Sequence, residues 1–390
     1  MHILLVPSWY ATPTNPIRGS FFRDQARALQ KAGHRVGMLI PPTKLRSWHG
    51  LAEVRRYWRR SNDDIDIADD EGIIIYRIPW WGWLPSLWPV KRGELALKIF
   101  DRYCDEVGQP DVLHAHSILY GGYIAAYIGQ RRNIPVVLTE HSTNFLTNSI
   151  LPDQKRIIRS TLRDVAKAFA VGPALAEAVQ SFTSAHDVGV IWNIVDTEFF
   201  VPAAQITPAD TFSLLMIASL TPRKGHDMLL AAFRHAFHKQ NVTLTIVGSG
   251  YHGKRLEQLQ ARIADLELQN QIELLGLVSR DDLLSLIQQC HALVSSSYSE
   301  GFGVTLIEAM ACGKPVIATR SGGPEHFVDE ATGILVPVGD VDAMADAMRR
   351  MRDTYQHYAP DKIRAACIER FSEQAIVEQL VSVYKQLLEE

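Results

Sequence analysis

Residues 292–319 read ALVSSSYSEGFGVTLIEAMACGKPVIAT, a pattern that indicates a strand, a glycine-containing loop, a helix and a second strand. The short apolar runs Ala292–Ser296 and Pro315–Ala318 are typical of buried parallel strands. Gly303–Ala311, between them, is expected to be helical, with two glycines at its start. The stretch is therefore a β–α–β crossover, the unit from which parallel sheets covered by helices are built.

The same alternation continues on both sides of this unit through the second half of the chain. Further strands are expected at Phe212–Ala218, Val242–Val247 and Ile272–Leu275, and further helices at Lys224–Lys239, Lys254–Leu266, Asp281–Gln289, Asp340–Met351, Pro360–Arg370 and Glu373–Leu388. Strands and helices that alternate in this way predict a doubly wound, Rossmann-like domain.

The first half of the chain predicts a second domain of the same kind. Strands are expected at His2–Val6, Val36–Ile40, Ile73–Ile78, Val112–His114 and Val136–Thr139, with helices at Ser20–Lys31, Leu95–Val107, Tyr120–Arg131, Asp153–Lys167 and Pro173–Phe182. FFVPAAQITPADT, residues 199–211, is rich in proline and small residues and indicates a linker. We therefore expect domains at 1–205 and 206–370, and a terminal helix, 371–390, that packs back toward the first domain. Ligands of such sheets bind beyond the carboxyl ends of the strands, so a cleft between the two domains is expected.

Length and composition fit this organisation. The chain has 390 residues, of which 47% are hydrophobic and 21% charged, as in globular proteins. The first apolar run is broken by Pro7, too early for a signal peptide or membrane anchor. The four cysteines are scattered without a CxxC pair, which fits a reducing cytoplasm.

The charges are unevenly distributed along the chain. Residues 1–60 hold 11 Lys and Arg against 2 Asp and Glu, so this part of the surface is expected to meet an anionic partner.

The loop and helix of the opening stretch carry two acidic residues. Glu300 lies in the loop and Glu308 eight residues later in the helix. Eight helical residues span about 12 Å, so the carboxylates are expected to hold opposite ends of an extended ligand by its hydroxyls. The open N–H groups of Gly303, Val304 and Thr305 predict an anion site. An ordinary helix start with an acid beside its dipole is the alternative.

A basic pair, Arg223-Lys224, follows the first strand of the second series. A charge pair near 4 Å is worth up to about 4 kcal/mol at an effective dielectric constant near 20. A helix dipole supplies roughly 0.3–1 kcal/mol. We therefore expect the basic pair to dominate the binding of a diphosphate, the alternative being two solvated surface charges.

Three further positions are candidates. GSGYHG, residues 248–253, matches GxGxxG but follows the second strand of its series, whereas a dinucleotide fingerprint follows the first. Gly248 and Gly250 are therefore interpreted as a turn beside a phosphate or base. His141 follows a strand of the first domain, where it could donate to a sugar hydroxyl or have only a structural role. Gly19 precedes the first long helix and marks a loop that a ligand can approach closely.

Three short sequence motifs are similar to metal-binding motifs. Asp64-Ile65-Asp66 lies in an acidic run, and Asp340-Val341-Asp342 is interpreted as a helix start. Neither ends a buried strand. His114-Ala115-His116 has no further ligand nearby at metal spacing. No metal and no other cofactor is therefore expected.

Taken together, these motifs resemble those of retaining GT-B glycosyltransferases of family 4. The resemblance rests on SEGFGVTLIEAMACGKPVIATRSGGPEHFVDEATGILVPVGD (299–340), IASLTPRKG (217–225), VGSG (247–250), IELLGLV (272–278), VIWNIVDTEFF (190–200) and GSFFRDQARALQKAGHRV (19–36). These segments are spread over nearly the whole chain. Two positions depart from the family pattern: Ala218-Ser219-Leu220 stands where Gly-Arg-Leu is common, and Gly19-Ser20 where Gly-Gly is usual.

The resemblance implies a GT-B fold, with a nucleoside-diphosphate sugar on the C-terminal domain and an acceptor on the N-terminal domain. It implies that Glu300 binds hydroxyls of the donor sugar, Glu308 the ribose, and Arg223 and Lys224 the diphosphate. It places Gly19 beneath the diphosphate, His141 beside the reacting centre, and Gly301, Phe302, Gly303, Val304 and Thr305 around the sugar and phosphates. It also implies retention at the anomeric carbon and catalysis without a metal.

A basic and tryptophan-rich segment suggests where the acceptor binds. Six of the eight tryptophans lie between residues 48 and 88, among many arginines. Such residues suit an anionic membrane surface. The candidates for contact with membrane or acceptor are Arg55, Arg56, Trp58, Arg59, Trp80 and Trp81. Alternatively, the tryptophans belong to a core and the arginines are neutralised by the acidic run that follows.

The sequence therefore predicts a cytoplasmic, metal-independent hexosyltransferase, peripheral on the inner face of the membrane. Its expected acceptor is a glycan or lipid-linked sugar in polysaccharide or lipopolysaccharide synthesis, and no nucleic acid is expected as a partner. The alternatives are a GT-B sugar-nucleotide epimerase or a phosphorylase, an inactive nucleotide-sugar sensor, and, on the GxGxxG match alone, an NAD oxidoreductase.

Overall fold

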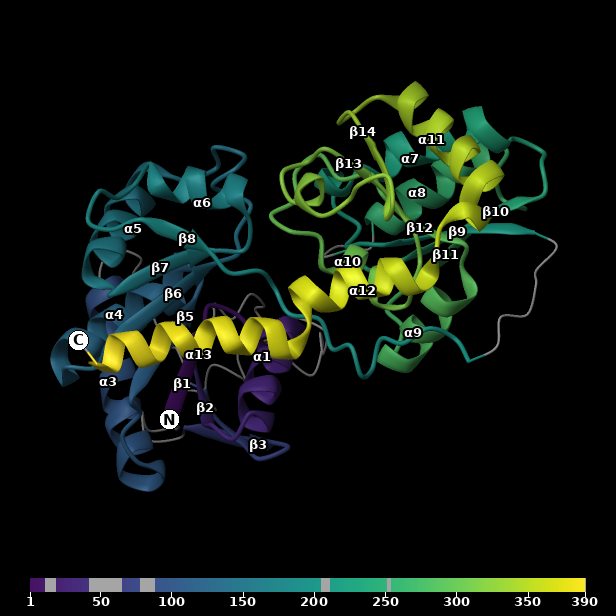
Figure 1. Cartoon of the computed structure of the whole chain (residues 1–390). Coiled ribbons are helices and arrows are strands. Elements are labelled where there is room, and N and C mark those ends of the chain that lie inside the picture. The colour runs from purple at the N-terminus through teal and green to yellow at the C-terminus, as the bar shows by residue number, and fades with distance from the viewer. Residues whose placement is uncertain (11–18, 42–64, 78–87, 205–210, 251–253, 390) are drawn as a thin grey trace, which may run out of the picture. The chain divides into compact units, whose positions relative to one another are not determined.

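The computed structural model describes residues 1–10, 19–41, 65–77, 88–204, 211–250 and 254–389 (Figure 1). The chain divides into two compact units. Unit 1 consists of Met1–Ile191 and Val377–Glu390, and unit 2 of Trp192–Ile376. Each unit is an α/β domain with its own sheet, so the expected fold class is confirmed.

Unit 1 contains an eight-stranded sheet in the order β3-β4-β2-β1-β5-β6-β7-β8. Its strands are β1 (His2–Pro7), β2 (Arg35–Ile40), β3 (Asp66–Asp70), β4 (Ile73–Arg77), β5 (Val112–His116), β6 (Val136–Glu140), β7 (Lys167–Ala170) and β8 (Val188–Val190). All neighbours pair in parallel except β3 and β4. Its helices are α1 (Ser20–Lys31), α3 (Trp88–Val107), α4 (Tyr123–Arg132), α5 (Pro152–Asp164) and α6 (Pro173–Gln180), and a short helical turn, η2, covers Ile118–Gly122.

Unit 2 contains a six-stranded, fully parallel sheet in the order β11-β10-β9-β12-β13-β14. Its strands are β9 (Phe212–Ile217), β10 (Val242–Val247), β11 (Ile272–Leu275), β12 (Ala292–Ser295), β13 (Val316–Thr319) and β14 (Gly333–Val336). Its helices are α7 (His226–Phe237), α8 (Lys254–Asp265), α9 (Arg280–Gln289), α10 (Val304–Ala311), α11 (Val341–Thr354) and α12 (Pro360–Phe371). Three short helical turns, η3 (Pro222–Lys224), η4 (Pro324–His326) and η5 (Tyr355–His357), complete it.

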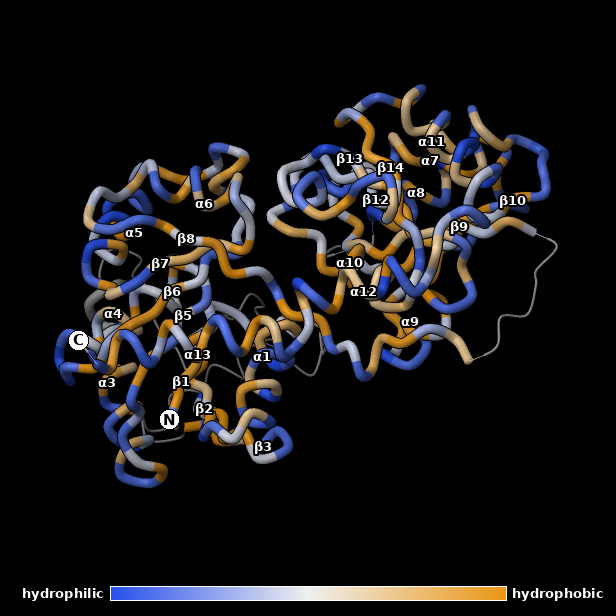
Figure 2. The backbone as a smooth tube through the Cα atoms, in the orientation of Figure 1, coloured by the Kyte–Doolittle hydropathy of each residue, from blue (hydrophilic) through white to orange (hydrophobic). Residues whose placement is uncertain are grey.

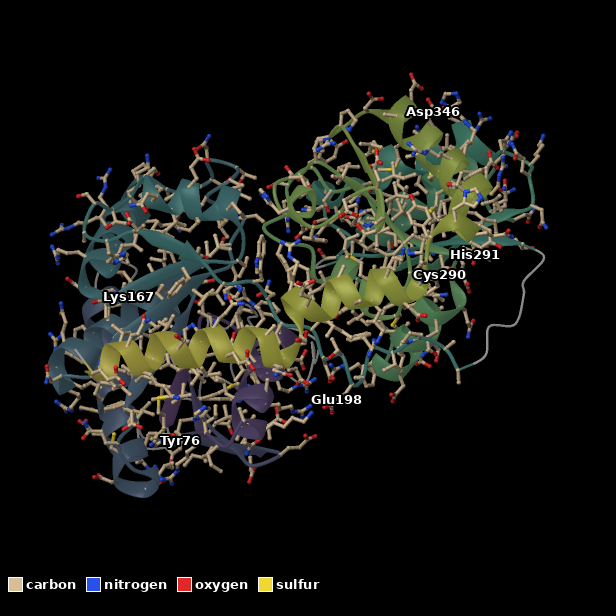
Figure 3. All side chains as sticks on the ribbon, in the orientation of Figure 1. Tyr76, Lys167, Glu198, Cys290, His291 and Asp346 are labelled. Carbon is tan, nitrogen blue, oxygen red and sulfur yellow. The ribbon has the colours of Figure 1, made fainter. Side chains whose placement is uncertain are left out.

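The cores lie between the sheets and their helices. The strands are largely apolar in Figure 2, and the apolar sides of α7, α8 and α11 join β9, β10 and β12 in one buried cluster of unit 2. Side chains of the core and of the surface differ in exposure. Tyr76 in unit 1 is 1% exposed, whereas Asp346 points outward from α11 (Figure 3). Burial of these apolar surfaces is the main force that holds each unit together.

The last helix, α13 (Glu373–Glu389), begins in unit 2 and belongs to unit 1 from Val377 onward. Within unit 1, Tyr384 of α13 is fully buried, and its hydroxyl lies 2.5 Å from Nδ1 of His114 in β5. Gln25 of α1 lies 3.3 Å from the same nitrogen. Helices α1 and α13 therefore cover the same face of the unit 1 sheet (Figure 1).

The division into units differs from the expected boundary at residue 205. The segment after β8 already belongs to unit 2, because Val195 N–H donates to the carbonyl of Phe371 at 2.9 Å. Arg364 donates to the carbonyls of Thr197 and Phe200, each at 2.8 Å. The proline-rich composition near residue 205 predicted a linker there, but residues 192–204, which precede it, belong to unit 2.

Candidate functional site

The strand order of unit 2 reverses between β9 and β12. These two strands pair in parallel, with Leu215 opposite Leu293, and the chain continues from β9 to one side of the sheet and from β12 to the other. The loops at their carboxyl ends therefore diverge and leave a crevice, which is where doubly wound sheets bind ligands. The two loops are residues 218–225 and 296–303, which contain the basic pair and Glu300.

Backbone contacts lock these two loops together. Gly225 has a φ of +70°, and a Cβ there would clash with the carbonyl oxygen of Ser296. The Ser296 hydroxyl donates to the carbonyls of Lys224 and Gly225 at 3.0 and 3.1 Å. The N–H of Tyr298 donates to the carbonyl of Arg223 at 2.8 Å. A glycine is thus required at position 225 for both its φ and its lack of a side chain.

The charged side chains of the two loops meet. Lys224 forms an ion pair with Glu300, and their side chains are only 17% and 15% exposed. Arg223 donates from Nη1 to the carbonyl of Ser299 at 2.5 Å. The structure thus brings together three of the four predicted catalytic residues, Arg223, Lys224 and Glu300.

The ionisation of Glu300 follows from these contacts. Burial alone would raise the pKa of its carboxyl group, but the charge of Lys224, the hydrogen bond from it and the charge of Arg223 outweigh burial. The hydroxyl of Ser297 also donates to Glu300, at 3.2 Å. The net effect holds the pKa of Glu300 below its ordinary value, so Glu300 is a carboxylate at neutral pH.

The start of α10 has the geometry of an anion site. Gly303 precedes the helix with a φ of +110°, and no side chain caps the helix start. Val304 and Thr305, in the first turn, are partly exposed, and Glu308 lies one turn further along the helix. An uncapped helix start directs backbone N–H groups and a positive dipole toward the loop that holds Glu300.

The resemblance placed Phe302 among the residues that surround the donor, but its side chain is buried in the core of unit 2. It is 2% exposed and packs in an aromatic cluster, with ring centroids 5.6 Å from Trp192, 5.3 Å from Phe371 and 5.4 Å from Phe327. Its backbone remains part of the loop. The side chain therefore anchors the loop in the core of unit 2 instead of lining a ligand site.

The loop after β10 packs against the loop after β9. Gly248 has a φ of +154°, and a Cβ there would clash with the carbonyl oxygen of Ala218. The N–H of Leu220 donates to the carbonyl of Ser249 at 3.0 Å. Gly250 follows in the same loop, and residues 251–253 lie outside the described part of the chain. Gly248 is thus needed where the backbone passes the end of β9.

His141 lies at the corresponding end of the unit 1 sheet, directly after β6. Its Nε2 lies 3.1 Å from Nδ1 of His116, the last residue of β5. The rings of Phe21 and Phe22, from α1, lie 5.1 and 5.2 Å from the His141 ring. Gly19 precedes α1 with a φ of +74°, and a Cβ there would lie 2.9 Å from Cδ2 of Phe22. Gly19 and His141 thus share one aromatic neighbourhood within unit 1.

Glu140 is a buried carboxyl group that we did not predict from the sequence. Its oxygens accept from the backbone N–H groups of Ile118, His141 and Ser142 at 2.7, 2.7 and 2.6 Å. Burial raises its pKa even though these hydrogen bonds act in the opposite direction. It therefore organises the loops after β5 and β6. The sequence feature that could have pointed to Glu140 is its position directly before His141 at the end of a strand.

The metal-like patterns have structural explanations where they are described. Asp340 caps α11, because its carboxylate accepts from the N–H of Ala343 at 2.9 Å. His114 and His116 are fully buried in β5. Within the ranges that the structure covers, no three His, Cys, Asp or Glu residues are grouped as a metal site would require. Asp64 lies outside those ranges.

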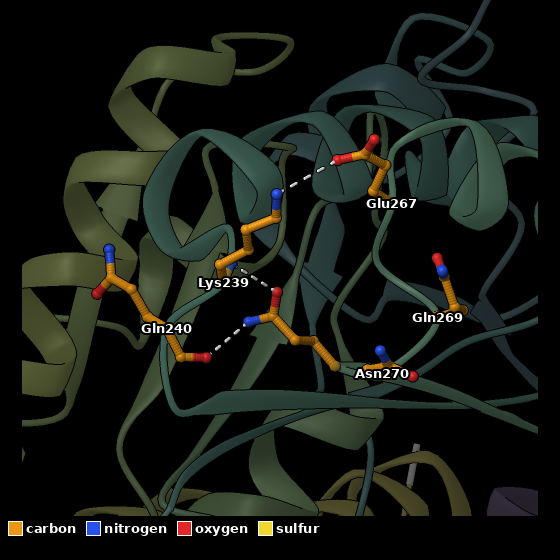
Figure 4. Close-up of a pocket in the computed structure, with 6 residues that line it drawn as sticks. Lys239, Gln240, Glu267, Gln269 and Asn270 are labelled. Carbon is orange, nitrogen blue, oxygen red and sulfur yellow. Dashed lines mark hydrogen bonds and ion pairs between the residues drawn. The ribbon is translucent and has the colours of Figure 1, made fainter.

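A pocket of about 520 Å³ opens at the other end of the unit 2 sheet (Figure 4). It is lined by the turn before β10 and the turn before β11: Lys239, Gln240, Glu267, Gln269, Asn270 and Gln271. The side-chain amide of Gln271 spans this region, donating to the carbonyls of Phe237 and Gln240. The pocket lies at the amino ends of the strands and is therefore separate from the Arg223 and Glu300 loops.

The predicted membrane or acceptor residues lie outside the described residues. This applies to Arg55, Arg56, Trp58, Arg59, Trp80 and Trp81. In the part of the chain that is described, none of the helices combines the length and the apolar character needed to cross a membrane.

Comparison with known proteins identifies the family. The family model described as Glycosyltransferase Family 4 matches residues 19–199, and the one described as Glycosyl transferases group 1 matches residues 202–374. The chain is 26% identical over 292 residues to N-acetyl-alpha-D-glucosaminyl L-malate synthase of Bacillus anthracis, covering 71% of this chain and 75% of that protein. It is 27% identical over 354 residues to D-inositol 3-phosphate glycosyltransferase of Saccharomonospora viridis, covering 81% and 80%.

Solved structures agree at the level of the fold. Sucrose-phosphate synthase of Thermosynechococcus elongatus superposes with a TM-score of 0.78 at 20% identity, over 99% of both chains. HepE of Anabaena, solved with UDP and glucose, superposes with a TM-score of 0.74 at 19% identity, also over 99% of both chains. The two family matches, which together span nearly all of residues 19–374, and this shared architecture show that the chain is a glycosyltransferase of family 4 with the GT-B fold.

Proposed function

We propose that the protein is a retaining hexosyltransferase that moves a sugar from a nucleoside-diphosphate sugar to a glycan or lipid-linked acceptor. One observation carries the donor half of this proposal. Arg223, Lys224 and Glu300 meet at the carboxyl ends of β9 and β12, where the strand order of unit 2 reverses. HepE, which shares the fold, was solved with UDP and with UDP-glucose, which supports a nucleotide sugar as the donor.

Lys224 and Glu300 are proposed to exchange partners when the donor binds. The diphosphate takes over Lys224 and Arg223, and Glu300 becomes available to accept hydrogen bonds from hydroxyls of the donor sugar. A charge pair near 4 Å contributes up to about 4 kcal/mol at an effective dielectric constant near 20. The uncapped N–H groups at the start of α10 add a smaller contribution, roughly 0.3–1 kcal/mol. Glu308 is proposed to bind the ribose.

The chemistry is departure of the nucleoside diphosphate from an oxocarbenium-like sugar carbon. Arg223 and Lys224 stabilise the negative charge that develops on the leaving oxygen, because they are held in place before the reaction. His141 of unit 1 is proposed to donate to the donor sugar beside the reacting carbon. The leaving phosphate accepts the proton of the acceptor hydroxyl. The basic pair supplies the positive charge that the step requires, so we propose catalysis without a metal or other cofactor.

The acceptor side of the proposal rests on the sequence. The tryptophan- and arginine-rich residues between 44 and 88 are proposed to contact the inner face of the cytoplasmic membrane and a lipid-linked acceptor there. The protein would then act from the cytoplasm in the synthesis of a cell-surface polysaccharide or lipopolysaccharide. Flotation with anionic liposomes tests this part, and binding that does not weaken with salt, or no binding, contradicts it.

A thermal-shift screen of UDP-, GDP- and ADP-sugars tests the donor half. A ligand at 100 times its dissociation constant stabilises the folded protein by about 2.7 kcal/mol. One sugar nucleotide is expected to raise the melting temperature of the wild type and to do so far less in Lys224→Ala. Lys362→Ala, which removes an exposed lysine on α12, is the matched control and should respond like the wild type. Equal shifts in Lys224→Ala and wild type would contradict the proposal.

A further inference from the structure

The strand order of unit 1 also reverses, between β1 and β5. These two strands pair in parallel, and the chain continues from β1 to β2 on one side of the sheet and from β5 to β6 on the other. A ligand crevice is therefore expected beyond the carboxyl ends of β1 and β5. The described residues that follow these ends are 8–10 and 117–122.

The loop after β5 has a strained backbone. Ser117 has a φ of +66°, although it is not a glycine. Tyr120 has a φ of +71° and a ψ of −78°, the values of a γ-turn with positive φ, which is rare and strained. Residues in such conformations persist only where their surroundings hold them, and they cluster at active and ligand-binding sites. The loop is therefore a candidate for ligand binding in unit 1.

The surroundings hold this turn from two neighbouring strands. The hydroxyl of Ser8, directly after β1, donates to the carbonyl of Leu119 at 2.5 Å and accepts from the N–H of Gly121 at 2.9 Å, so it bridges the turn. Glu140, at the end of β6, accepts from the N–H of Ile118 at 2.7 Å. The strained conformation is thus fixed before any ligand binds.

The side chain at the centre of the turn is an exposed aromatic ring. Tyr120 is 45% exposed, whereas Arg92, near the start of α3, is only 4% exposed. The guanidinium carbon of Arg92 lies 5.3 Å from the centroid of the Tyr120 ring, which is the geometry of a cation–π contact. The buried guanidinium supports one face of the ring. The strained turn therefore presents the rest of the ring to solvent instead of burying it.

We propose that Tyr120 is the residue on which a hexopyranose ring of the acceptor stacks. One face of a pyranose ring is lined by C–H groups, and these suit the electron-rich face of an aromatic ring. The hydroxyl groups at the edge of the sugar stay free for hydrogen bonding. This inference rests on the proposed function, to which it adds a neutral six-membered sugar as the acceptor group bound by unit 1.

Fluorine NMR of the whole protein labelled with 3-fluorotyrosine tests the proposal. The Tyr120 signal is the one that disappears in Tyr120→Phe. The probes are the methyl glycosides of glucose, galactose, mannose and N-acetylglucosamine. We expect at least one of them to shift the Tyr120 signal saturably and to leave the signal of Tyr358, a partly buried tyrosine of unit 2, in place. No shift of Tyr120 with any of these glycosides, or equal shifts of both signals, would overturn the proposal.

Variants of Tyr120 separate sugar binding from a structural role. Titrations by saturation-transfer difference NMR should show Tyr120→Phe binding the glycoside like the wild type, and Tyr120→Ala binding it about tenfold more weakly because the apolar contact is lost. Tyr120→Gly removes the ring and also relieves the positive φ. It should lose the same affinity and yet resist urea at least as well as Tyr120→Ala. Wild-type affinity in either folded variant that lacks the ring would overturn the proposal.

The donor screen distinguishes this proposal from the proposed function. If no sugar nucleotide stabilises the protein but a glycoside shifts the Tyr120 signal, the proposed function is contradicted and the sugar site on unit 1 is supported. If a sugar nucleotide stabilises the protein but no glycoside shifts that signal, the sugar site alone is overturned.

Discussion

At the scale of residues, the ion pair between Lys224 and Glu300 is the most informative feature. Both side chains are mostly buried and come from loops that follow different strands. A buried pair is costly to break from one side only, because the remaining charge loses its partner. In the proposed function, a diphosphate replaces Glu300 as the partner of Lys224, and the pair would keep the lysine in place until then.

Replacing Glu300 by Gln should change how stability depends on acid. The pKa of Glu300 is lowered in the folded protein, so its carboxylate stabilises the fold above the pKa of the unfolded chain, about 4.3. That stabilisation is lost as the pH falls through the lower, folded pKa. Urea unfolding should show Glu300→Gln less stable than the wild type at pH 7, with the difference shrinking as pH falls below about 4.3. Glu257→Gln, at an exposed position of α8, is the control, and a pH-independent difference for Glu300→Gln would contradict the prediction.

Replacing Gly225 by Ala should destabilise unit 2 and weaken donor binding together. The new Cβ would meet the Ser296 carbonyl in a backbone conformation with a φ of +70°. Strain of this kind costs about 1–3 kcal/mol. Urea unfolding measures the loss. Gly276→Ala, whose Cβ would have no neighbour within 4 Å, should cost much less, and equal losses would count against the account.

The loops that carry the charged candidate residues could be located from the sequence, but the contacts around them could not. Arg223, Lys224 and Glu300 each follow a strand of a regular alternating series, whereas their roles in donor binding were inferred from the family resemblance and remain a prediction. Phe302 stands next to Gly301 and Gly303 and could not be separated from them, because its contacts with Trp192 and Phe371 join segments distant in sequence. The hydrogen bonds of Glu140 likewise depend on tertiary contacts.

At the scale of elements, the bounds of helices and strands were predicted well where the hydrophobic pattern and the intrinsic propensity of the residues favoured the same structure. The helix Ser20–Lys31 and the strand Val242–Val247 have the expected bounds. The strand β3 was missed, since three of its five residues are aspartates, which disfavour strands. Its antiparallel pairing with β4 overrides that preference. The helix start at Asp340 was interpreted correctly.

Removing the cap of α11 tests the structural interpretation of Asp340. Asp340→Ala should cost about 1 kcal/mol, the usual loss for an N-cap residue. Glycosyl transfer and its response to added divalent cations should be unchanged, because the carboxylate only accepts from Ala343 N–H. Urea unfolding and turnover with and without EDTA are the measurements. A loss of turnover that Mg²⁺ or Mn²⁺ restores would instead indicate a metal site.

At the scale of the whole molecule, the candidate residues are divided between two units. Unit 2 holds the basic pair, Glu300 and Glu308, whereas unit 1 holds Gly19 and His141. α13 contributes its later turns to unit 1, where Tyr384 is fully buried. The C-terminal residues therefore stabilise the N-terminal unit, and residues far apart in the chain depend on each other for stability.

Truncating Tyr384 should lower the stability of unit 1 selectively. Replacing a buried aromatic residue by Ala costs about 3–5 kcal/mol. Calorimetry of Tyr384→Ala should show the transition of unit 1 at a lower temperature and that of unit 2 nearly unchanged. Lys385→Ala, the next position on the helix, is the control. A shift of the unit 2 transition alone would contradict the division described here.

The central claim is that Arg223 and Lys224 bind the diphosphate of the donor sugar at the ends of β9 and β12. The most direct test is a crystal structure of the protein with the sugar nucleotide that gives the largest thermal shift. We expect the diphosphate within hydrogen-bond distance of both basic side chains, with Lys224 moved from Glu300 and Glu300 on the sugar hydroxyls. A diphosphate bound elsewhere, with the Lys224–Glu300 pair intact, would contradict the claim.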